Sequence, residues 1–188
     1  LLRGETDPER RRSLETIGGQ AYRIRDMIGD AMTFARPPEP RIESILPARL
    51  VQDVVSSFEE TAKTQGTQLN LILDETLQIP ADPEQFRVVV SCLIRNSLEA
   101  LKKAGTIEIQ LQSVGSSHVI LRVSDDGPGI DEIEREHLFD PFFSGRQAGR
   151  GLGFGLSRCW QILRQHGGWI DTEEAATGFV ITTAWPVD

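Results

Sequence analysis

The sequence is short of basic residues. Its 188 residues include 20 Lys and Arg against 28 Asp and Glu, which gives a net charge of -8 at pH 7. A nucleic-acid surface needs clustered cations to neutralise phosphates. This balance argues against a nucleic-acid partner, and any phosphate site in the chain must be local.

Cysteines and long apolar runs are also scarce. Cys92 and Cys159 lack C-x-x-C spacing, so we expect reduced thiols that behave as small buried hydrophobes on two different helices. No apolar run is long enough to span a bilayer, and no signal peptide is recognisable. The sequence opens with LLRGE instead of methionine, and we expect it to be a piece of a longer protein.

What the first part of the chain does have is a regular apolar seam. Residues recur at alternating spacings of three and four, which is typical of helices that pack in a bundle; they are Leu14, Ile17, Ala21, Ile24, Ile28, Ala31 and Ala35. The pattern predicts one helix from Pro8 to Ala35, roughly 40 Å long, with Asp7 as N-cap and Pro8 at the first position. It ends before Pro37. An ordinary core-facing helix is the alternative.

After residue 40 the pattern becomes mixed. Strands are predicted at 41–46, 68–73, 106–114, 117–124, 168–172 and 178–187. Helices are predicted at 47–65, at 83–104 after an Asp82 N-cap, and from 156 to His166. This order indicates an α+β fold, a two-layer α/β sandwich whose mixed, largely antiparallel sheet has helices on one face, preceded by the long bundle-forming helix.

Three motifs in the second part carry chemistry. The first is GRGLGFGLSRCW from Gly149, in which glycines adjoin the start of an amphipathic helix, so backbone amides can approach an anionic ligand. The second is DDGPGI at 125–130, a strand end where an ionised Asp125 can accept the adenine amino proton; the alternative is an ordinary Asp-Gly turn. The third is NSLEAL, in which Asn96 lies at the flank of an apolar helix arc; a solvated asparagine is the alternative. The residues of this arc are Phe86, Val89, Val90, Leu93, Ser97, Ala100 and Leu101.

Together these motifs resemble the nucleotide-binding core of sensor histidine kinases, in the superfamily shared with gyrase, the MutL mismatch-repair proteins and the heat-shock chaperone ATPases. The resemblance covers nearly the whole chain. It implies an ATP-binding catalytic domain over 41–188, and over 1–37 the second helix of a dimerisation and phosphotransfer hairpin whose first helix is absent. It also implies a homodimer through that helix, a response regulator as partner, and a cytoplasmic location, on its own or as part of a membrane-bound sensor.

The resemblance also implies a set of site residues. It assigns Asn96 to Mg²⁺ held by the ATP phosphates and Asp125 to adenine. Phe139, Phe142 and Phe143 would anchor a lid, although core packing explains them too. The lid's Arg146 and Arg150 would meet phosphate or stay solvated. The residues expected to bind ATP are Asn96, Asp125, Gly127, Gly129, Ile130, Phe142, Arg146, Arg150, Gly151, Leu152, Gly153, Gly155 and Leu156.

Two departures from the family pattern shape the expected chemistry. Cys92 stands where the superfamily's ATP hydrolases place a glutamate base, which favours phosphoryl transfer over hydrolysis. The family's acceptor histidine lies on the first hairpin helix; the chain's histidines are His118, His137 and His166, all in the nucleotide-binding part and none spaced as a metal site. A serine kinase of the anti-sigma type and a non-catalytic, nucleotide-gated dimerisation module are the alternative functions.

Overall fold

The computed structural model describes residues 7–143, 153–173 and 177–188, and the chain divides into two compact units, Leu1–Pro38 and Glu39–Asp188. None of the described helices combines the length with the apolar composition that a membrane span requires.

In the described part of the first unit there is one helix, α1 (Pro8–Ala35), with the bounds that its sequence predicts. The Asp7 side chain accepts the backbone N–H groups of Glu9 and Arg10 at 2.9 and 3.4 Å, which satisfies two donors of the first turn. The apolar seam of α1 is not covered within this unit: Ile17, Ile24 and Ile28 are 64%, 54% and 56% exposed.

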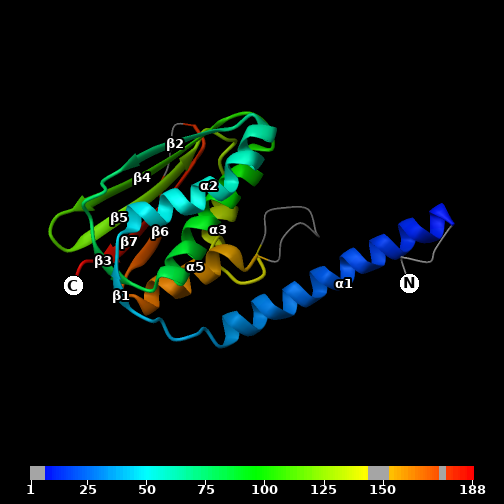
Figure 1. Cartoon of the computed structure of the whole chain (residues 1–188), viewed down its shortest axis with the longest axis horizontal. Coiled ribbons are helices and arrows are strands. Elements are labelled where there is room, and N and C mark those ends of the chain that lie inside the picture. The colour runs from blue at the N-terminus through cyan, green and yellow to red at the C-terminus, as the bar shows by residue number, and fades with distance from the viewer. Residues whose placement is uncertain (1–6, 144–152, 174–176) are drawn as a thin grey trace. The chain divides into compact units, whose positions relative to one another are not determined.

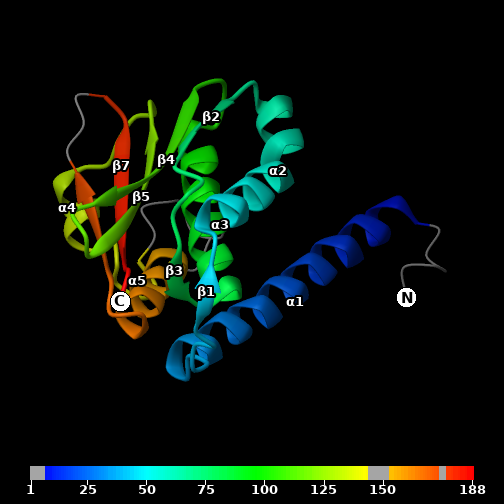
Figure 2. The ribbon, with the colours of Figure 1, turned by 60° about the vertical axis from the view of Figure 1, so that its left-hand side comes forward.

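The second unit is the predicted sandwich. Its sheet has the order β2-β4-β5-β7-β6, in which only the β2–β4 pair is parallel. The strands are β2 (Gln68–Leu73), β4 (Thr106–Val114), β5 (His118–Asp125), β6 (Trp169–Glu173) and β7 (Phe179–Pro186). One face of the sheet carries the helices α2 (Pro47–Gln65), α3 (Pro83–Leu101) and α5 (Gly155–Gln165) (Figure 1). Figure 2 shows α2 and α3 together on that side.

Some local elements differ from the sequence prediction. The strand expected at 41–46 is only β1 (Glu43–Ile45), and it pairs in a separate two-stranded sheet with β3 (Ile79–Ala81), which was not predicted. A short helix, α4 (Glu132–Glu136), was also missed. Helix α3 ends at Leu101 instead of 104, because Lys102 adopts a left-handed conformation with φ 55° and caps it.

The core lies between α3 and the centre of the sheet. Alternate residues of β4 and β5 face the helices and are buried, among them Ile107, Ile109, Leu121 and Val123. On the helix side the predicted arc is buried through Ser97, and Ile94 and Leu98 are buried as well because α2 packs along a second side of α3. Phe86 packs on Trp185 of β7 with 4.9 Å between ring centroids.

His166 ties the end of α5 to the beginning of α3. Its Nδ1 donates to the Ile162 carbonyl at 2.8 Å, and its Nε2 accepts the Asp82 backbone N–H at 3.1 Å. These two bonds account for a histidine at this helix C-terminus.

The backbone just before β7 passes very close to the backbone at the end of β5. Gly178 has φ 82°, and a Cβ at this position would overlap the Asp125 carbonyl oxygen and lie 2.9 Å from the Asp126 Cα. The strand end that carries Asp125 therefore depends on a glycine here.

We predict that Gly178→Ala lowers the free energy of unfolding by about 3 kcal/mol or more, because left-handed strain adds to a backbone overlap. Gly115→Ala is the matched control, since Gly115 has φ 62° and a Cβ there would have nothing within 4 Å, and it should cost only about 1 kcal/mol. Urea unfolding measures both losses. Equal losses would show that this close approach has room for a side chain.

Candidate functional site

The site is organised around a carboxylate at the end of β5. Residues 119, 121, 123 and 125 of this strand alternate toward the helices, so Asp125, its last residue, extends into the layer between sheet and helices. It is only 6% exposed. A buried carboxylate needs donors, and the surroundings of Asp125 supply them.

The Gly127 backbone N–H donates to the Asp125 carboxylate at 3.1 Å. Burial raises the pKa of Asp125 above its ordinary value, while hydrogen bonding from Ser97, Gly127 and Phe179 acts in the opposite direction. Its neighbour Asp126 is exposed and accepts the Thr106 N–H at 2.8 Å, which closes the junction of β4 and β5.

Asn96 lies one residue before Ser97 on α3 and is half-buried. Its Nδ2 donates to the Cys92 sulfur at 3.9 Å, so the amide oxygen is left to accept a hydrogen bond or bind a cation. Cys159 of α5 also lies against Cys92. Its hydrogen bond with Cys92 and its burial raise the pKa of the Cys159 thiol well above the usual value, so Cys159 remains a thiol. Cys92 is thus in contact with both α5 and Asn96.

The first turn of α5 lies against the same part of α3. A Cβ at Gly155 would be 3.0 Å from the Cys92 sulfur, so the helix start approaches α3 closely. Among the described residues no side chain caps this helix, and its first N–H groups are available to an anion. Gly153 has φ 69°, and a Cβ at this position would overlap the Phe143 carbonyl. The glycine motif is therefore packed closely against residues 142–143.

The three phenylalanines of the predicted lid anchor differ in their surroundings. Phe139 packs against the core. Phe142 is 72% exposed, adopts φ 67°, and contacts Phe154 edge-on at 4.7 Å. Phe139 is thus packed as the core-packing alternative expects, and Phe142 lies at the surface beside the glycine motif.

The structure thus brings together the parts of the predicted site that it describes. Helix α3 packs against β5, which ends at Asp125, and it approaches Gly155 through Cys92, whose sulfur also accepts the Asn96 amide. Gly129 and Ile130 are half-buried in the loop after Gly127, and Leu156 packs partly against the core. Arg146, Arg150, Gly151 and Leu152 lie outside the described residues.

Three residues near Asp125 were not predicted from the sequence to belong to the site. The pattern assigns Ser97 only to the apolar arc of its helix, although a hydroxyl among apolar neighbours is itself a sign of a buried partner. It identifies Gly178 and Phe179 only as the beginning of a strand, and no local pattern links them to Asp125, 53 and 54 positions earlier in the sequence.

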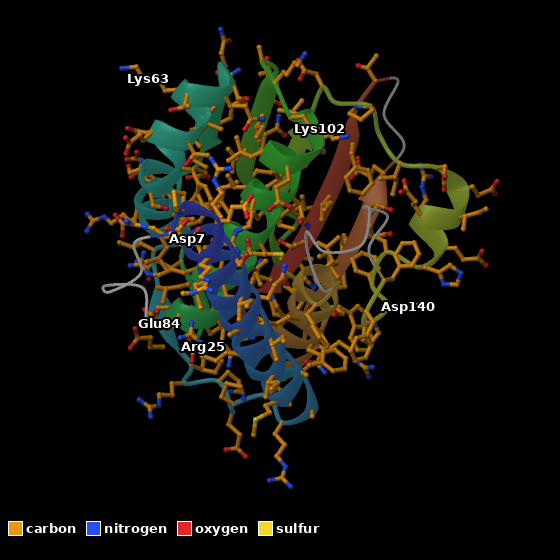
Figure 3. All side chains as sticks on the ribbon, turned by 90° about the vertical axis from the view of Figure 1, so that its right-hand side faces the viewer. Asp7, Arg25, Lys63, Glu84, Lys102 and Asp140 are labelled. Atoms are coloured by element: carbon orange, nitrogen blue, oxygen red, sulfur yellow. The ribbon has the colours of Figure 1, made fainter. Side chains whose placement is uncertain are left out.

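The histidines stay apart from this site. His118 contacts the Ser117 hydroxyl at 2.9 Å, and His137 contacts Asp140 at 2.8 Å beside α4, where Figure 3 labels Asp140. Within the described ranges no group of three or more His, Cys, Asp or Glu side chains could hold a metal ion. A cation here would therefore depend on ligands other than a protein cage.

Comparison with known proteins agrees with this geometry. Residues 81–188 match the family described as histidine kinase-, DNA gyrase B-, and HSP90-like ATPase. The sensor histidine kinase ZraS of Salmonella typhimurium is 26% identical over 172 residues, which cover 91% of this chain and 37% of ZraS. The chain thus spans little more than a third of that relative.

Two solved structures are also similar. The catalytic domain of histidine kinase ThkA is 30% identical with a TM-score of 0.73, over 78% of this chain and 96% of that one. ThkA in complex with the response regulator protein TrrA is 25% identical with a TM-score of 0.81, over 98% of this chain and 53% of that one. The chain therefore belongs to the family of histidine kinase-, DNA gyrase B- and HSP90-like ATPases, and its second unit is an ATP-binding domain of the histidine kinase type.

Proposed function

We propose that this chain is the ATP-binding catalytic part of a sensor histidine kinase, which transfers the γ-phosphoryl group of ATP to a histidine on a dimerisation helix for onward transfer to a response regulator. The observation that carries the proposal is the buried Asp125 carboxylate at the end of β5, which packs against the helix that holds Asn96. The group proposed to recognise the base and the amide proposed for the phosphate side then lie in the same packed layer.

In this proposal Asp125 accepts a hydrogen bond from the adenine amino group. Guanine has a carbonyl at that position, and two acceptors would face each other, so the site selects adenine. The backbone of Gly127, Gly129 and Ile130 borders the base, and Leu156 and Phe142 contribute apolar contacts nearby. Gly153, Gly155 and the N-terminal end of α5 receive the phosphates, which fits the uncapped first turn. The same role for Arg146, Arg150, Gly151 and Leu152 rests on the sequence alone.

Magnesium fits the residues present. Mg²⁺ keeps several waters and takes few protein ligands besides substrate phosphates, so it does not require the acidic cage that the described residues lack. Asn96 would hold it through Oδ1, the atom left over when Nδ2 donates to Cys92. When bound, the ion would neutralise charge on the phosphates.

Cys92 makes the site a poor ATP hydrolase. Its sulfur receives the Asn96 amide and lies against the Cys159 thiol, so it is engaged at the position where a hydrolase needs a base for water. Positioning and charge neutralisation are sufficient for transfer to a protein side chain.

The first unit supports a dimeric kinase. We propose that residues 1–37 form the second helix of a dimerisation hairpin and that 41–188 is the catalytic domain. The exposed seam of Ile17, Ile24 and Ile28 on α1 is suited to a helical bundle between two copies. The complex of ThkA with TrrA supports a response regulator as the partner.

We predict that Asp125→Asn abolishes useful ATP binding without loss of stability. The raised pKa means that Asp125 stabilises the fold while protonated and that this contribution is lost as pH rises through its folded pKa, so at neutral pH a neutral side chain costs nothing here. Calorimetry should show ATP affinity about tenfold to hundredfold weaker. The melting temperature without ATP should stay equal or rise. Unchanged ATP affinity would show that Asp125 does not bind the adenine amino group.

We predict that Asn96→Ala weakens the binding of Mg-ATP more than that of metal-free ATP, because the amide oxygen contacts the cation. Titration calorimetry with and without EDTA measures the two losses. Asn70→Ala is the matched control, since Asn70 is the other asparagine of the sequence and lies exposed on β2. Equal losses for both forms of ATP would exclude Asn96 as the metal contact.

Phosphoryl transfer is tested with ATP labelled in its γ-phosphate. The chain is mixed with a two-helix polypeptide in which a helix carrying a His-Glu motif precedes residues 8–35 of this sequence. We expect label on that polypeptide that is lost in acid and kept in alkali, as phosphohistidine is. The chain alone should bind Mg-ATP and retain no stable label.

Other outcomes identify the alternatives. Acid-stable label would indicate the serine kinase, and bound ATP without any label would indicate the nucleotide-gated dimerisation module. Rapid release of inorganic phosphate that no acceptor changes would contradict the kinase proposal and indicate a mechanical ATPase.

A further inference from the structure

The chain segment that leads into the second unit is held by a tertiary hydrogen bond. Residues 37–40 include three prolines, so Glu39 is the only one of the four with a backbone N–H to donate. Arg41 follows them, and its backbone N–H donates to Oδ2 of Asp82 at 2.8 Å. Asp82 is 41 positions further along the chain and only 7% exposed. The bond therefore fixes the end of the proline segment to the domain.

The pairing of β1 with β3 explains why a side chain makes this bond. Glu43 pairs with Ala81 in an antiparallel register, and the same register, if continued, would place Arg41 opposite Pro83. Pro83 has no N–H, and its carbonyl belongs to the first turn of α3, so its backbone cannot continue the strand pairing. The Asp82 carboxylate supplies the acceptor instead.

The two oxygens of this carboxylate serve different elements. Oδ1 accepts the backbone N–H groups of Glu84 and Gln85, both at 2.9 Å, and so caps α3. Oδ2 accepts the Arg41 N–H. The Asp82 backbone N–H in turn donates to His166 at 3.1 Å, at the end of α5. The end of the proline segment, the start of α3 and the end of α5 thus meet at one buried residue.

Both helices also carry parts of the proposed nucleotide site. Asn96 lies on α3, and Gly155 begins α5. A bond that fixes the chain entry relative to these helices also fixes the point about which the nucleotide domain turns. Transfer to an acceptor on another helix requires the γ-phosphate to arrive in the right direction, so the position of this point affects transfer.

We propose that Asp82 is a positioning residue for phosphoryl transfer, whose carboxylate holds Arg41 and so keeps the pivot of the catalytic domain within residues 37–40. The proposal rests on the function proposed above. Without the bond the bending segment would lengthen toward β1, the domain would sample more orientations, and the effective concentration of the γ-phosphate at the acceptor would fall. ATP binding is local to the domain and would not change.

Asp82→Asn separates the two roles of the carboxylate. Asparagine caps helices about as well as aspartate does, but its amide N–H would face the Arg41 N–H, which is also a donor. Hydrogen exchange of the full chain, followed by NMR, should be faster at the Arg41 amide by about tenfold or more. Asp82→Ser, which also caps α3 through a single oxygen, is the second variant. Asp7→Asn, the same change at the N-cap of α1, is the control and should leave exchange at Arg41 unaltered.

Transfer is measured in the full chain extended before Leu1 by a helix that carries a His-Glu motif, in a single turnover with γ-labelled Mg-ATP. We expect both Asp82 variants to label the histidine about fivefold more slowly, because the domain reaches it less often. Calorimetry should show that ATP affinity changes by less than about twofold, since the cap of α3 is kept.

The outcomes separate the inference from the function on which it rests. Unchanged exchange at Arg41 would show that Asp82 does not hold the segment, and faster exchange with unchanged transfer would show that the bond does not set the pivot. ATP affinity that falls as much as transfer would show that Asp82 only stabilises the domain. Each of these results overturns the inference and leaves the proposed function intact. An unaltered extended chain that binds ATP without labelling its histidine would overturn the proposed function and the inference with it.

Discussion

The packing of α3 against the centre of the sheet is the contact on which the rest of this domain depends. Phe86, Val89, Val90 and Leu93 are fully buried between the strands and the other helices, and Trp185 closes the same core from β7. Burial of several large side chains of this kind is worth about 1.5–3 kcal/mol each. Because the helix is fixed so firmly, the polar groups along its flank have fixed positions too. A nucleotide site can be built from single side chains at its far end without a separate scaffold.

The same packing explains how an acidic chain can offer a site for a polyanion. With a net charge of -8, the protein has no general attraction for phosphate. What the described part of the proposed site supplies is local and largely uncharged: the N–H groups at the start of α5 and the amide of Asn96, with the one carboxylate, Asp125, proposed to bind the base instead of the phosphates. Selection of the ligand then depends on where these groups point more than on the charge that they carry.

Sequence alone predicted the elements whose signals are local. Asp7 and Pro8 define the start of α1 and Pro37 its end, because capping and proline act within a few residues, and all three could be read directly. Strand β3 was missed because it has three residues with Pro80 in the middle, too few for any alternation to appear. Helix α4 was missed because its five residues, EIERE, give almost no apolar pattern. Asp125 was found at a strand end, but its burial and its pairing with Phe179 of β7 come from the tertiary fold and have no signature in the sequence.

The place of β7 in the sheet has a consequence for how the domain is made. This strand is the last of the sheet along the chain, yet it lies between β5 and β6 and pairs with both. Strand β6 has no partner until residues 179–186 arrive, and the Trp185 side chain that closes the core arrives with them. During synthesis the nascent chain would hold β2, β4 and β5 with an unfinished edge, so the domain completes its fold only after nearly all of it has left the ribosome. Folding of this domain is therefore a late and concerted event, governed by pairings between distant parts of the chain.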